Sequence, residues 1–473
     1  MPVVDRLSFE QELLAEEIEQ APERLDRWRD HVALDAGDGR LARSRPCGKL
    51  GLRQAVTRSS LAKKPACHPL NISDKTYDDC VPILAFVDFE LTVDQREIQA
   101  VTREFAQAEI EPHAAEWDRE HRFPKELFGK LAELGLMGAC VPEEYGGAGA
   151  DFLSYILVLE ELSRADAGVG VTVAVHTSAV TLPILTFGSD EQRSRFVPPL
   201  ARGEVLGAFA LTEPEAGSDA GSLRTSAKPD GDGWTISGAK QWITNGHHAG
   251  TFLLFARTDP DTPGAKGVSA FILDAEHVRP TRVEEKLGLN SSVTSDIVVE
   301  DAHVGPDRLL HEDGKGFVVA MATLDGGRIG IGAQALGIAQ AAYDFARNYA
   351  LERKQFGKRI AEFQAIQWKL ADMATQIDAA RLLIYRAAWL KQQGRPHTEE
   401  GAKAKLFASE MARRQTGEAI QILGGYGYTK EFPVERYYRD AKITEIYEGT
   451  SEIQRLVIAR SILGLQERAL AQG

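Results

Sequence analysis

Glu448 is the residue in this chain best suited to act as a general base. It lies in segment 446–455 (IYEGTSEIQR), where a carboxylate is followed by a glycine, two hydroxyls and a helical pattern. Ser451 and Gln454 have the spacing of a capping box, which predicts a helix just after the glutamate. Gly449 permits a close approach of the backbone to a ligand. A carboxylate on such a turn loses water to the ligand, so its pKa rises toward the value that a general base requires. The alternative is an exposed glutamate ahead of an ordinary helix.

Two upstream segments carry groups suited to binding a polar cofactor. Segment 209–219 (FALTEPEAGSD) is strand-like up to Thr212 and continues as a turn rich in Pro and Gly that holds Ser218. Backbone N–H groups and these two hydroxyls can bind a polar ring edge or a pyrophosphate. Segment 241–246 (QWITNG) places an aromatic face beside a hydroxyl and ends in Asn-Gly, which predicts a hairpin turn. For both segments the alternative is an ordinary β-turn, with a buried tryptophan in the second.

Taken together, and in their order along the chain, segments 209–219, 241–246 and 446–455 resemble the acyl-CoA dehydrogenase family. Segments 353–358 (RKQFGK) and 421–427 (QILGGYG) also match, so the resemblance runs from residue 88 to residue 470. It is strongest for the short-chain and medium-chain branch, which includes butyryl-CoA dehydrogenase and carries its base in the Tyr-Glu-Gly-Thr turn. Other branches take the base from an earlier helix. The corresponding position here is Gly327, which favours Glu448 as the base.

The resemblance implies a role for each matching residue. Glu448 is implied to be the catalytic residue. The residues implied to bind FAD are Phe209, Leu211, Thr212, Gly217, Ser218, Trp242, Thr244, Arg353, Gln364, Gln421, Gly424, Gly425, Thr450 and Glu452. Those implied to bind the acyl-CoA are Ser218, Asp325, Arg328 and Gly449. Arg353, Gln364, Gln421, Gly424 and Gly425 would hold the adenosine half of FAD across a dimer interface. Some relatives carry Gln in place of Glu452, which puts that contact in doubt.

The resemblance also implies a reaction. The base removes the α-proton of an acyl-CoA, a hydride passes from the β-carbon to flavin N5, and the product is a trans-2-enoyl-CoA. The backbone N–H of Glu448 and a ribityl hydroxyl would bind the thioester oxygen, and such donors typically contribute about 3–4 kcal/mol each. The implied partners are an electron-transfer flavoprotein and further copies of the chain in a homotetramer. The expected substrates are straight short- or medium-chain acyl-CoAs of fatty acid β-oxidation.

Three alternative functions stay open. The substrate can be a branched acyl-CoA, because Gly326 and Gly327 leave room beside the acyl group. An acyl-CoA oxidase would have a similar fold, and access of oxygen to the flavin distinguishes it. A DNA-binding relative without dehydrogenase activity would need a basic surface and a replaced base.

Several implied site residues also have purely structural interpretations. Arg353 can pair with a carboxylate on its own helix. Asp325 and Arg328 are three residues apart and can simply pair with each other. The pair Gly424-Gly425 can be a helix C-cap. We interpret four residues near the C-terminus as framework, not as catalytic groups: Tyr437, Tyr438, Arg439 and Asp440.

Composition is that of a large enzyme without nucleic acid or membrane partners. The chain has 473 residues and a formal net charge of −14, which opposes nonspecific nucleic-acid binding. We find no uninterrupted apolar run of about 18 residues. The four cysteines form no CxxC pair, and the histidines show no metal-ligand spacing, so we predict neither a disulfide framework nor a metal. A reducing compartment follows, which is the cytoplasm of a bacterium or the matrix of a mitochondrion.

Periodicity predicts an α+β fold with an N-terminal α domain (87–205), a middle β domain (206–311) and a C-terminal α bundle (312–473). Hairpins are expected at 231–233 and 245–246. Residues 1–86 differ in composition and carry three of the four cysteines. We expect them to be an extension of unknown role, disordered or non-catalytic. A start codon assigned too far upstream would also produce it.

Overall fold

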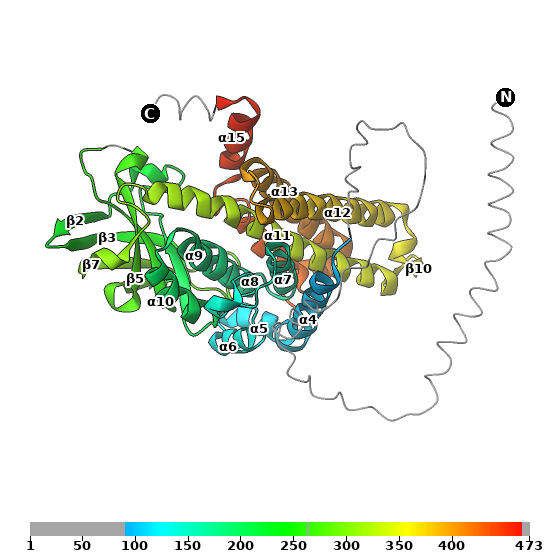
Figure 1. Ribbon diagram of the computed structural model, residues 1–473. Helices are drawn as coiled ribbons and strands as arrows, with labels where there is room; N and C mark the ends of the chain where they lie inside the picture. The colour runs from blue at the N-terminus through cyan, green and yellow to red at the C-terminus, as the bar shows by residue number, and fades with distance from the viewer. Residues whose placement is uncertain (1–89, 263, 466–473) are drawn as a thin grey trace, which may run out of the picture. The chain divides into compact units, whose positions relative to one another are not determined.

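The computed structural model describes residues 90–262 and 264–465. Within these residues a helical region is followed by a β-sheet and then by a bundle of long helices (Figure 1). This order confirms the predicted α, β, α arrangement. The expected extension 1–86 lies outside the described residues.

Side-chain caps fix the starts of several helices in the first helical region. Thr92 and Gln95 form the predicted capping box of the first described helix. Asp151 accepts a hydrogen bond from Ser154 N at 2.7 Å and caps the helix that follows it. The α-helices of this region are α4 (Val93–Glu109), α5 (Glu111–Glu120), α6 (Lys125–Glu133), α7 (Phe152–Ala165), α8 (Ala167–Ala174), α9 (Leu182–Phe187) and α10 (Asp190–Ala201).

A π-helix, Val175–Thr181, joins α8 to α9, and all of its residues are buried. It packs directly on strand β1 (Leu206–Ala210), because a Cβ at Gly207 would lie 2.7 Å from Val180 Cβ. His176 links the two elements. Burial lowers the pKa of His176 to about 4, so its ring is neutral. Its Nδ1 accepts from Gly207 N at 3.1 Å, and Nε2 therefore donates to Leu200 O at 3.0 Å.

The sheet has the order β6-β7-β3-β2-β4-β5-β8, and β1 pairs with β4 in parallel. Its other strands are β2 (Ser226–Asp230), β3 (Gly233–Thr244), β4 (Ala249–Arg257), β5 (Val268–Asp274), β6 (Arg279–Val283), β7 (Thr294–Val304) and β8 (Leu309–Leu310). The hairpin predicted at 231–233 is confirmed between β2 and β3. The hairpin predicted at 245–246 is wrong, because β2 lies between β3 and β4 in the sheet. Buried Asn245 instead donates to Gly207 O and Thr172 O, so this turn anchors the sheet to β1 and α8.

The C-terminal region is built around one long helix, α11 (Gly316–Glu352), which begins against strand β5 and contacts α7 and α13 most extensively. A Cβ at Gly316 would lie 2.3 Å from the backbone of Ser269, so glycine is required where α11 meets the sheet. The remaining helices are α12 (Gln364–Gln392), α13 (Thr398–Leu423), α14 (Val434–Ile443) and α15 (Ser451–Ile462). A short hairpin of β9 (Lys354–Gln355) and β10 (Lys358–Arg359) lies between α11 and α12, at the end of the bundle opposite the sheet (Figure 1).

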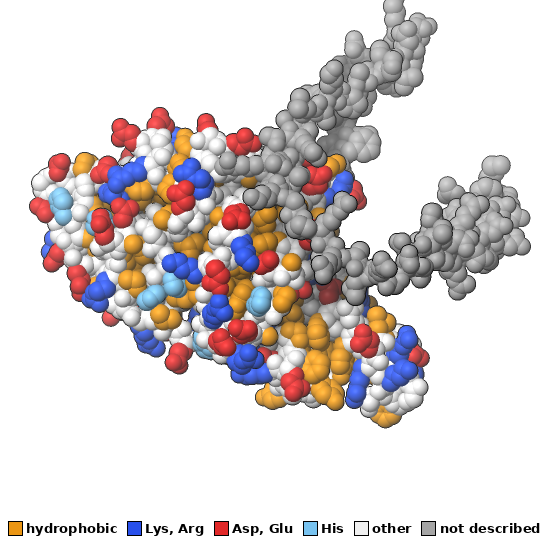
Figure 2. All heavy atoms as spheres, turned by 90° about the horizontal axis from the view of Figure 1, so that it is seen from below, with side chains coloured by type: hydrophobic (Ala, Val, Ile, Leu, Met, Phe, Trp, Pro, Cys, Tyr) orange, Lys and Arg blue, Asp and Glu red, His pale blue; other side chains and the backbone are white. Residues whose placement is uncertain are grey.

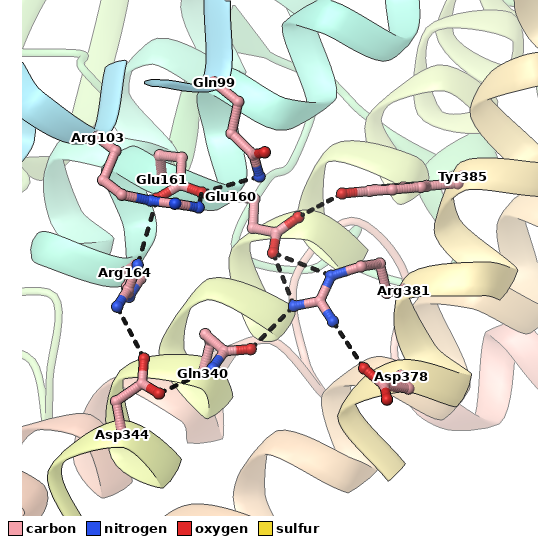
Figure 3. Close-up of polar contacts among 10 residues, drawn as sticks. All are labelled: Gln99, Arg103, Glu160, Glu161, Arg164, Gln340, Asp344, Asp378, Arg381 and Tyr385. Atoms are coloured by element: carbon pink, nitrogen blue, oxygen red, sulfur yellow. Dashed lines mark hydrogen bonds and ion pairs between the residues drawn. The ribbon is translucent and has the colours of Figure 1, made fainter. Parts of the chain in front are cut away.

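A buried network of charged groups fixes α7 against its neighbours (Figure 3). Glu161 accepts from Gln99 and Arg103 of α4, with Arg103 NH2 at 2.5 Å. The adjacent Glu160 accepts from Arg381 NH2 at 3.0 Å and from Tyr385, both on α12. Burial raises the pKa of Glu160, and Arg381 opposes that rise. Since both glutamates are almost fully buried, the network specifies how α4, α7 and α12 pack.

One helical segment of the described residues, Ala167–Phe187, is long and apolar enough to cross a membrane by length and composition. In this fold 89% of that window is buried inside the protein. The segment contains the π-helix that packs on β1, and it is apolar because it is a helix of the protein core.

Candidate active site

Glu448 lies on a sharp turn between α14 and α15. Its φ angle is +50° and that of Gly449 is +90°, both in the left-handed region. A non-glycine residue in this region is uncommon and is held there by its surroundings. Helix α15 starts just beyond the turn, as predicted, but its cap differs from the prediction. Thr450 is the N-cap and accepts from Ile453 N, so the predicted capping box of Ser451 and Gln454 is wrong by one residue.

Gln454 stabilises the turn at Glu448 and does not cap the start of α15. Its Nε2 donates to Glu448 O at 3.2 Å and to Gly449 O at 2.8 Å. Gly449 O also accepts from Lys405 Nζ at 2.5 Å. Both side chains are fully buried. The backbone of Glu448 and Gly449 is therefore fixed by groups that come from α13 and α15.

The carboxylate of Glu448 is buried against α11. A Cβ at Gly327 would lie 2.1 Å from Glu448 Oε2. This oxygen is buried and accepts no hydrogen bond from the described residues. Burial raises the pKa of Glu448 to about 7, while Lys405 and Arg328 lower it. A carboxylate with this pKa can both accept and release a proton near neutral pH.

The two predicted CoA-binding residues on α11 form the ion pair that we gave as their structural alternative. Arg328 NH1 lies 2.5 Å from Asp325 Oδ1, and Thr398 donates to the other oxygen of Asp325 at 2.6 Å. Arg328 is nevertheless incompletely satisfied, since its buried Nε has no partner among the described residues. Arg328 and Glu448 are thus brought together with Gly449 and Thr450 at the middle of the bundle.

The sheet brings the two predicted flavin segments together. Gln241 N donates to Thr212 O at 2.9 Å, which places Thr212 beside the strand end that carries Trp242 and Thr244. Trp242 is 55% exposed and has a φ angle of +62°, so the alternative of a buried tryptophan is wrong. Phe209 is partly buried against Phe255, with ring centroids 5.1 Å apart. Leu211 is buried below this surface. An exposed aromatic face beside two hydroxyls is suited to a planar ring with polar edges.

A buried ion pair that sequence reasoning missed lies under the first segment. Lys240 Nζ lies 2.7 Å from Glu213 Oε1 and donates to Leu211 O at 3.1 Å. Glu213 also accepts from the backbone N–H groups of Arg224 and Thr225. Burial lowers the pKa of Lys240 to about 8, and Glu213 raises it. The sequence of 233–244 carried no clear signal of this pair, because the buried positions Gly233, Ile236, Lys240 and Ile243 do not alternate along the strand.

Gly217 and Ser218 lie on an exposed loop beyond Thr212, and nothing lies within 4 Å of a Cβ at Gly217. The loop runs on into an open cleft of about 550 Å³. Asp219, Arg224 and Arg257 are among the residues that line it. Arg224 is paired with Glu215, and Arg257 donates to backbone carbonyls of the loop.

Three other predicted cofactor residues lie together at the C-terminal end of α11. Arg353, Gly424 and Gly425 line a cleft of about 520 Å³ together with Tyr349, Gln355, Ile360, Ile422, Leu423, Tyr426 and Thr429. The Arg353 guanidinium lies 5.4 Å from the ring of Tyr426 and has no ion pair among the described residues, so the surface ion pair is wrong. Gly424 is the C-cap of α13, with a φ angle of +63°, which confirms the structural interpretation of the Gly424-Gly425 pair as a helix C-cap.

Three further predicted cofactor residues are exposed and line neither cleft. Gln364 is exposed at the first turn of α12, and Gln421 is exposed in the last turn of α13 near the 520 Å³ cleft. Glu452 is exposed in the first turn of α15.

The framework interpretation of the C-terminal tyrosine and charge cluster is confirmed for its ion pairs. Arg439 pairs with Asp118 at 2.6 Å and with Glu435, four residues earlier, at 2.7 Å. Asp440 accepts from Leu289 N at 2.6 Å, which ties α14 to the β domain. Burial raises the pKa of Asp440 to about 7.

One group of possible metal ligands occurs among the described residues. Asp274, Glu276 and His277 bring three ligand atoms within 4.8 Å of one another. Asp274 is already paired with Arg308 at 2.6 Å, and the group lies at the end of β5, not at Glu448. The prediction that the chain uses no metal stays a prediction.

Comparison with known proteins identifies the same three regions. Models of the acyl-CoA dehydrogenase N-terminal, middle and C-terminal domains match residues 92–204, 208–302 and 314–463. A short-chain specific acyl-CoA dehydrogenase of Clostridium acetobutylicum is 50% identical over 378 residues, which are 80% of this chain and 100% of that protein.

Two solved structures are similar over the same share of the chain. Butyryl-CoA dehydrogenase from Megasphaera elsdenii has a TM-score of 0.78 and 46% identity, covering 80% of this chain and 100% of that one. A chain from a structure of the electron transferring flavoprotein of Acidaminococcus fermentans, studied for flavin-based electron bifurcation, has a TM-score of 0.78 and 48% identity, covering 80% and 99%.

Proposed function

Because the chain belongs to the acyl-CoA dehydrogenase family, we propose that it oxidises short- or medium-chain acyl-CoAs to trans-2-enoyl-CoAs with Glu448 as the base. FAD is the cofactor. The observation that carries the proposal is the buried carboxylate of Glu448, whose Oε2 has no hydrogen-bond donor among the described residues and whose pKa burial raises to about 7.

The residues around the sheet edge fit a flavin. Trp242 offers an exposed ring face, Thr212 and Thr244 offer hydroxyls, and the open space above Gly217 admits a ligand close to the backbone. The distant cleft beside Arg353 fits a nucleotide, because it combines a guanidinium, an aromatic ring and two glycines. Gly424 and Gly425 leave at least 4 Å free where side chains would otherwise stand.

Each protein group then has a defined task. Glu448 takes the α-proton of the thioester on its carboxylate. The bonds from Gln454 and Lys405 keep the turn fixed, so that the carboxylate does not reorganise during proton transfer. When bound, FAD accepts the β-hydrogen as a hydride. Arg328, with its unsatisfied Nε, contacts the CoA side of the substrate, and Gly449 lines the acyl thioester.

The acyl chain is short in the proposed substrate. Relatives at about half identity are described as short-chain specific and as butyryl-CoA dehydrogenase. Glu448 takes the place beside Gly327, which is the geometry of a base in the Tyr-Glu-Gly-Thr turn. We therefore expect butyryl-CoA and octanoyl-CoA to react faster than palmitoyl-CoA.

A complete FAD site requires a second copy of the chain. Asp325 lies in α11 and Arg353 caps the C-terminus of the same helix, 28 residues later, which corresponds to about 42 Å at 1.5 Å per residue. The cleft at Arg353 therefore serves a cofactor other than the one beside this chain's own Glu448. Large exposed apolar side chains offer surface for assembly, among them Phe356 (94% exposed), Tyr428 (86%) and Trp368 (64%). Figure 2 shows one face on which apolar side chains gather between charges of both signs. We propose a dimer as the unit that completes the FAD site, and a tetramer formed by two such dimers.

The proposed electron acceptor is an electron-transfer flavoprotein. Support comes from the similarity to a chain in the structure of the electron transferring flavoprotein of A. fermentans. No oxidase function is proposed.

Anaerobic reduction tests the proposal. The purified full-length chain is mixed with butyryl-, octanoyl-, palmitoyl- and isovaleryl-CoA, and bleaching of the flavin absorbance is followed. We expect bleaching that is fastest with the two shorter straight chains. Absence of bleaching with every thioester would contradict dehydrogenation, and a fastest reaction with palmitoyl-CoA would contradict the chain length. The reduced enzyme is then mixed with either electron-transfer flavoprotein or oxygen. Faster reoxidation by oxygen would identify an oxidase.

A further inference from the structure

Lys405 is the one fully buried ammonium beside the turn of Glu448. It lies in the first third of α13, where the surrounding positions are alanines and apolar side chains. Its Nζ donates to Gly449 O at 2.5 Å, and no carboxylate of the described residues lies within ion-pair distance of it. Burial lowers the pKa of Lys405 to about 8, and Glu448 raises it. A lysine held in the interior without a paired acid is costly, so a structural role alone does not explain it.

The other groups around the turn leave Lys405 as the main source of positive charge. Arg328 of α11 is already neutralised by Asp325. Glu445, just before the turn, is paired with Arg413 at 2.7 Å and with Lys442 at 2.6 Å. The hydroxyls of Tyr447 and of Tyr155 on α7 are neutral, because burial raises both pKa values far above the ordinary range.

We propose that Lys405 is a positioning residue for the catalytic base: its ammonium clamps the Gly449 carbonyl and its charge keeps the carboxylate of Glu448 ionised in a buried site. The proposal rests on the proposed role of Glu448. The Lys405 ammonium therefore acts on the site in two ways. The hydrogen bond holds the left-handed turn, and the charge offsets the cost of removing the carboxylate from water.

Two substitutions separate the effects. Lys405→Gln keeps an N–H donor, on a side chain one atom shorter, but removes the charge. Lys405→Met removes both. The matched control is Lys403→Met on the same helix, since Lys403 is a half-buried partner of Glu399 four residues earlier and has no hydrogen bond or ion pair with the turn among the described residues.

The activity test is the pH profile of kcat/KM with butyryl-CoA. For the unsubstituted chain the rate should rise through a midpoint at about 7 as Glu448 ionises. In Lys405→Gln the midpoint should move upward by ~1 unit, and the rate should recover at high pH. Lys405→Met should show the same shift with a lower plateau, and Lys403→Met should show neither. An unmoved midpoint in Lys405→Gln would overturn the charge effect.

A second measurement does not depend on turnover. Tm is measured at pH 7.5, which lies between the pKa values of Glu448 and Lys405, and at pH 5 for Lys405→Gln and Glu448→Gln, singly and together. At pH 7.5, Lys405→Gln should lower Tm more when Glu448 is present than when position 448 is glutamine. At pH 5, where Glu448 is protonated, this difference should vanish. Equal losses of Tm in both backgrounds at pH 7.5 would overturn the proposal. A chain that shows the coupling but no acyl-CoA oxidation would instead contradict the proposed function.

Discussion

The carboxylate of Glu448 occupies the space that any side chain at Gly327 would need, because a Cβ there would lie 2.1 Å from Oε2 and 2.9 Å from Cδ. A side chain at position 327 and the carboxylate of Glu448, which lies 121 residues later in the chain, therefore cannot occupy this space together.

Gly327→Ala should displace the base without unfolding the chain. Alanine favours the helical backbone of α11 by about 1 kcal/mol, whereas its methyl group pushes the carboxylate away from its place. We expect kcat with butyryl-CoA to fall by about 10²-fold, as for a misplaced catalytic group, with little change in Tm. Gly330→Ala is the control, because its Cβ would meet only the end of the Leu159 side chain, at 3.1 Å. Equal activity in the two variants would contradict the shared volume.

Glu448→Gln should retain the yellow flavin and lose turnover. The amide keeps the shape of the side chain but cannot accept the α-proton, and a general base contributes about 10²–10⁴-fold to the rate. Stopped-flow bleaching by butyryl-CoA measures the loss. Bleaching within about threefold of the unsubstituted rate would exclude Glu448 as the base.

The same substitution should stabilise the protein at alkaline pH. Burial raises the pKa of Glu448 from 4.5 to about 7, so the folded chain binds this proton more tightly than the unfolded chain does. The charged form therefore lowers stability progressively as pH rises between these two values, and the full cost is present above pH 7. Glutamine removes a cost on the order of 1–3 kcal/mol. Tm of Glu448→Gln should exceed that of the unsubstituted chain at pH 8 by a few degrees and match it at pH 5. A constant difference at both values would refute the ionisation argument.

Lys240→Met should destabilise the β domain and loosen the flavin. It leaves Glu213 buried without its ammonium partner and frees the Leu211 carbonyl next to Thr212. Loss of one member of a buried pair typically costs about 3–5 kcal/mol. Arg279→Ala serves as the comparison, because its pair with Glu300 is exposed and worth less than about 1 kcal/mol. Chemical denaturation and flavin release on dilution measure both effects; equal stability of the two variants would contradict a structural role for the buried pair.

Arg353→Ala should weaken FAD binding across the subunit boundary. Loss of one charge-assisted contact typically costs about 1.5–3 kcal/mol, which corresponds to roughly a 10–100-fold rise in the FAD dissociation constant. Arg347→Ala in α11 should change it little, since Arg347 donates to the neighbouring Asn348 at the surface and lies 6.0 Å from the ring of Tyr343. Sedimentation gives the oligomer in the same samples. A monomer that retains full FAD would contradict a cofactor site shared between copies.

The sequence was sufficient for the order of the helical and β regions and for the turn that carries Glu448, because these depend on local patterns. Hydrophobic periodicity gives helices and strands, and the Glu-Gly-Thr turn precedes α15 as predicted. The misplaced capping box at Ser451 shows the limit of such reasoning. Thr450 directly follows Gly449 and Ser451 comes one position later, so the local sequence hardly shows which hydroxyl caps the helix. Their roles separate only when the buried Gln454 side chain turns back to the carbonyls of Glu448 and Gly449.

Long-range contacts were not predictable from single segments. Lys405 precedes the turn it holds by 44 residues, and Lys240 follows its partner Glu213 by 27. Neither lysine belongs to a motif, and each looks like a surface residue by type alone. Asn245-Gly246 was a false hairpin for the same reason, since the strands that flank a turn need not pair with each other.

The π-helix at Val175–Thr181 also constrains how this protein can change its length over evolution. Removing one residue there would return the segment toward α-helical spacing and turn everything after it by about 100°. His176 would then lose its bonds to β1 and α10, and Val180 would leave the hollow at Gly207. By contrast, the exposed loop around residues 259–262 joins two strands without such packing. Insertions and deletions among homologues should therefore accumulate in that loop and be nearly absent from the buried helix.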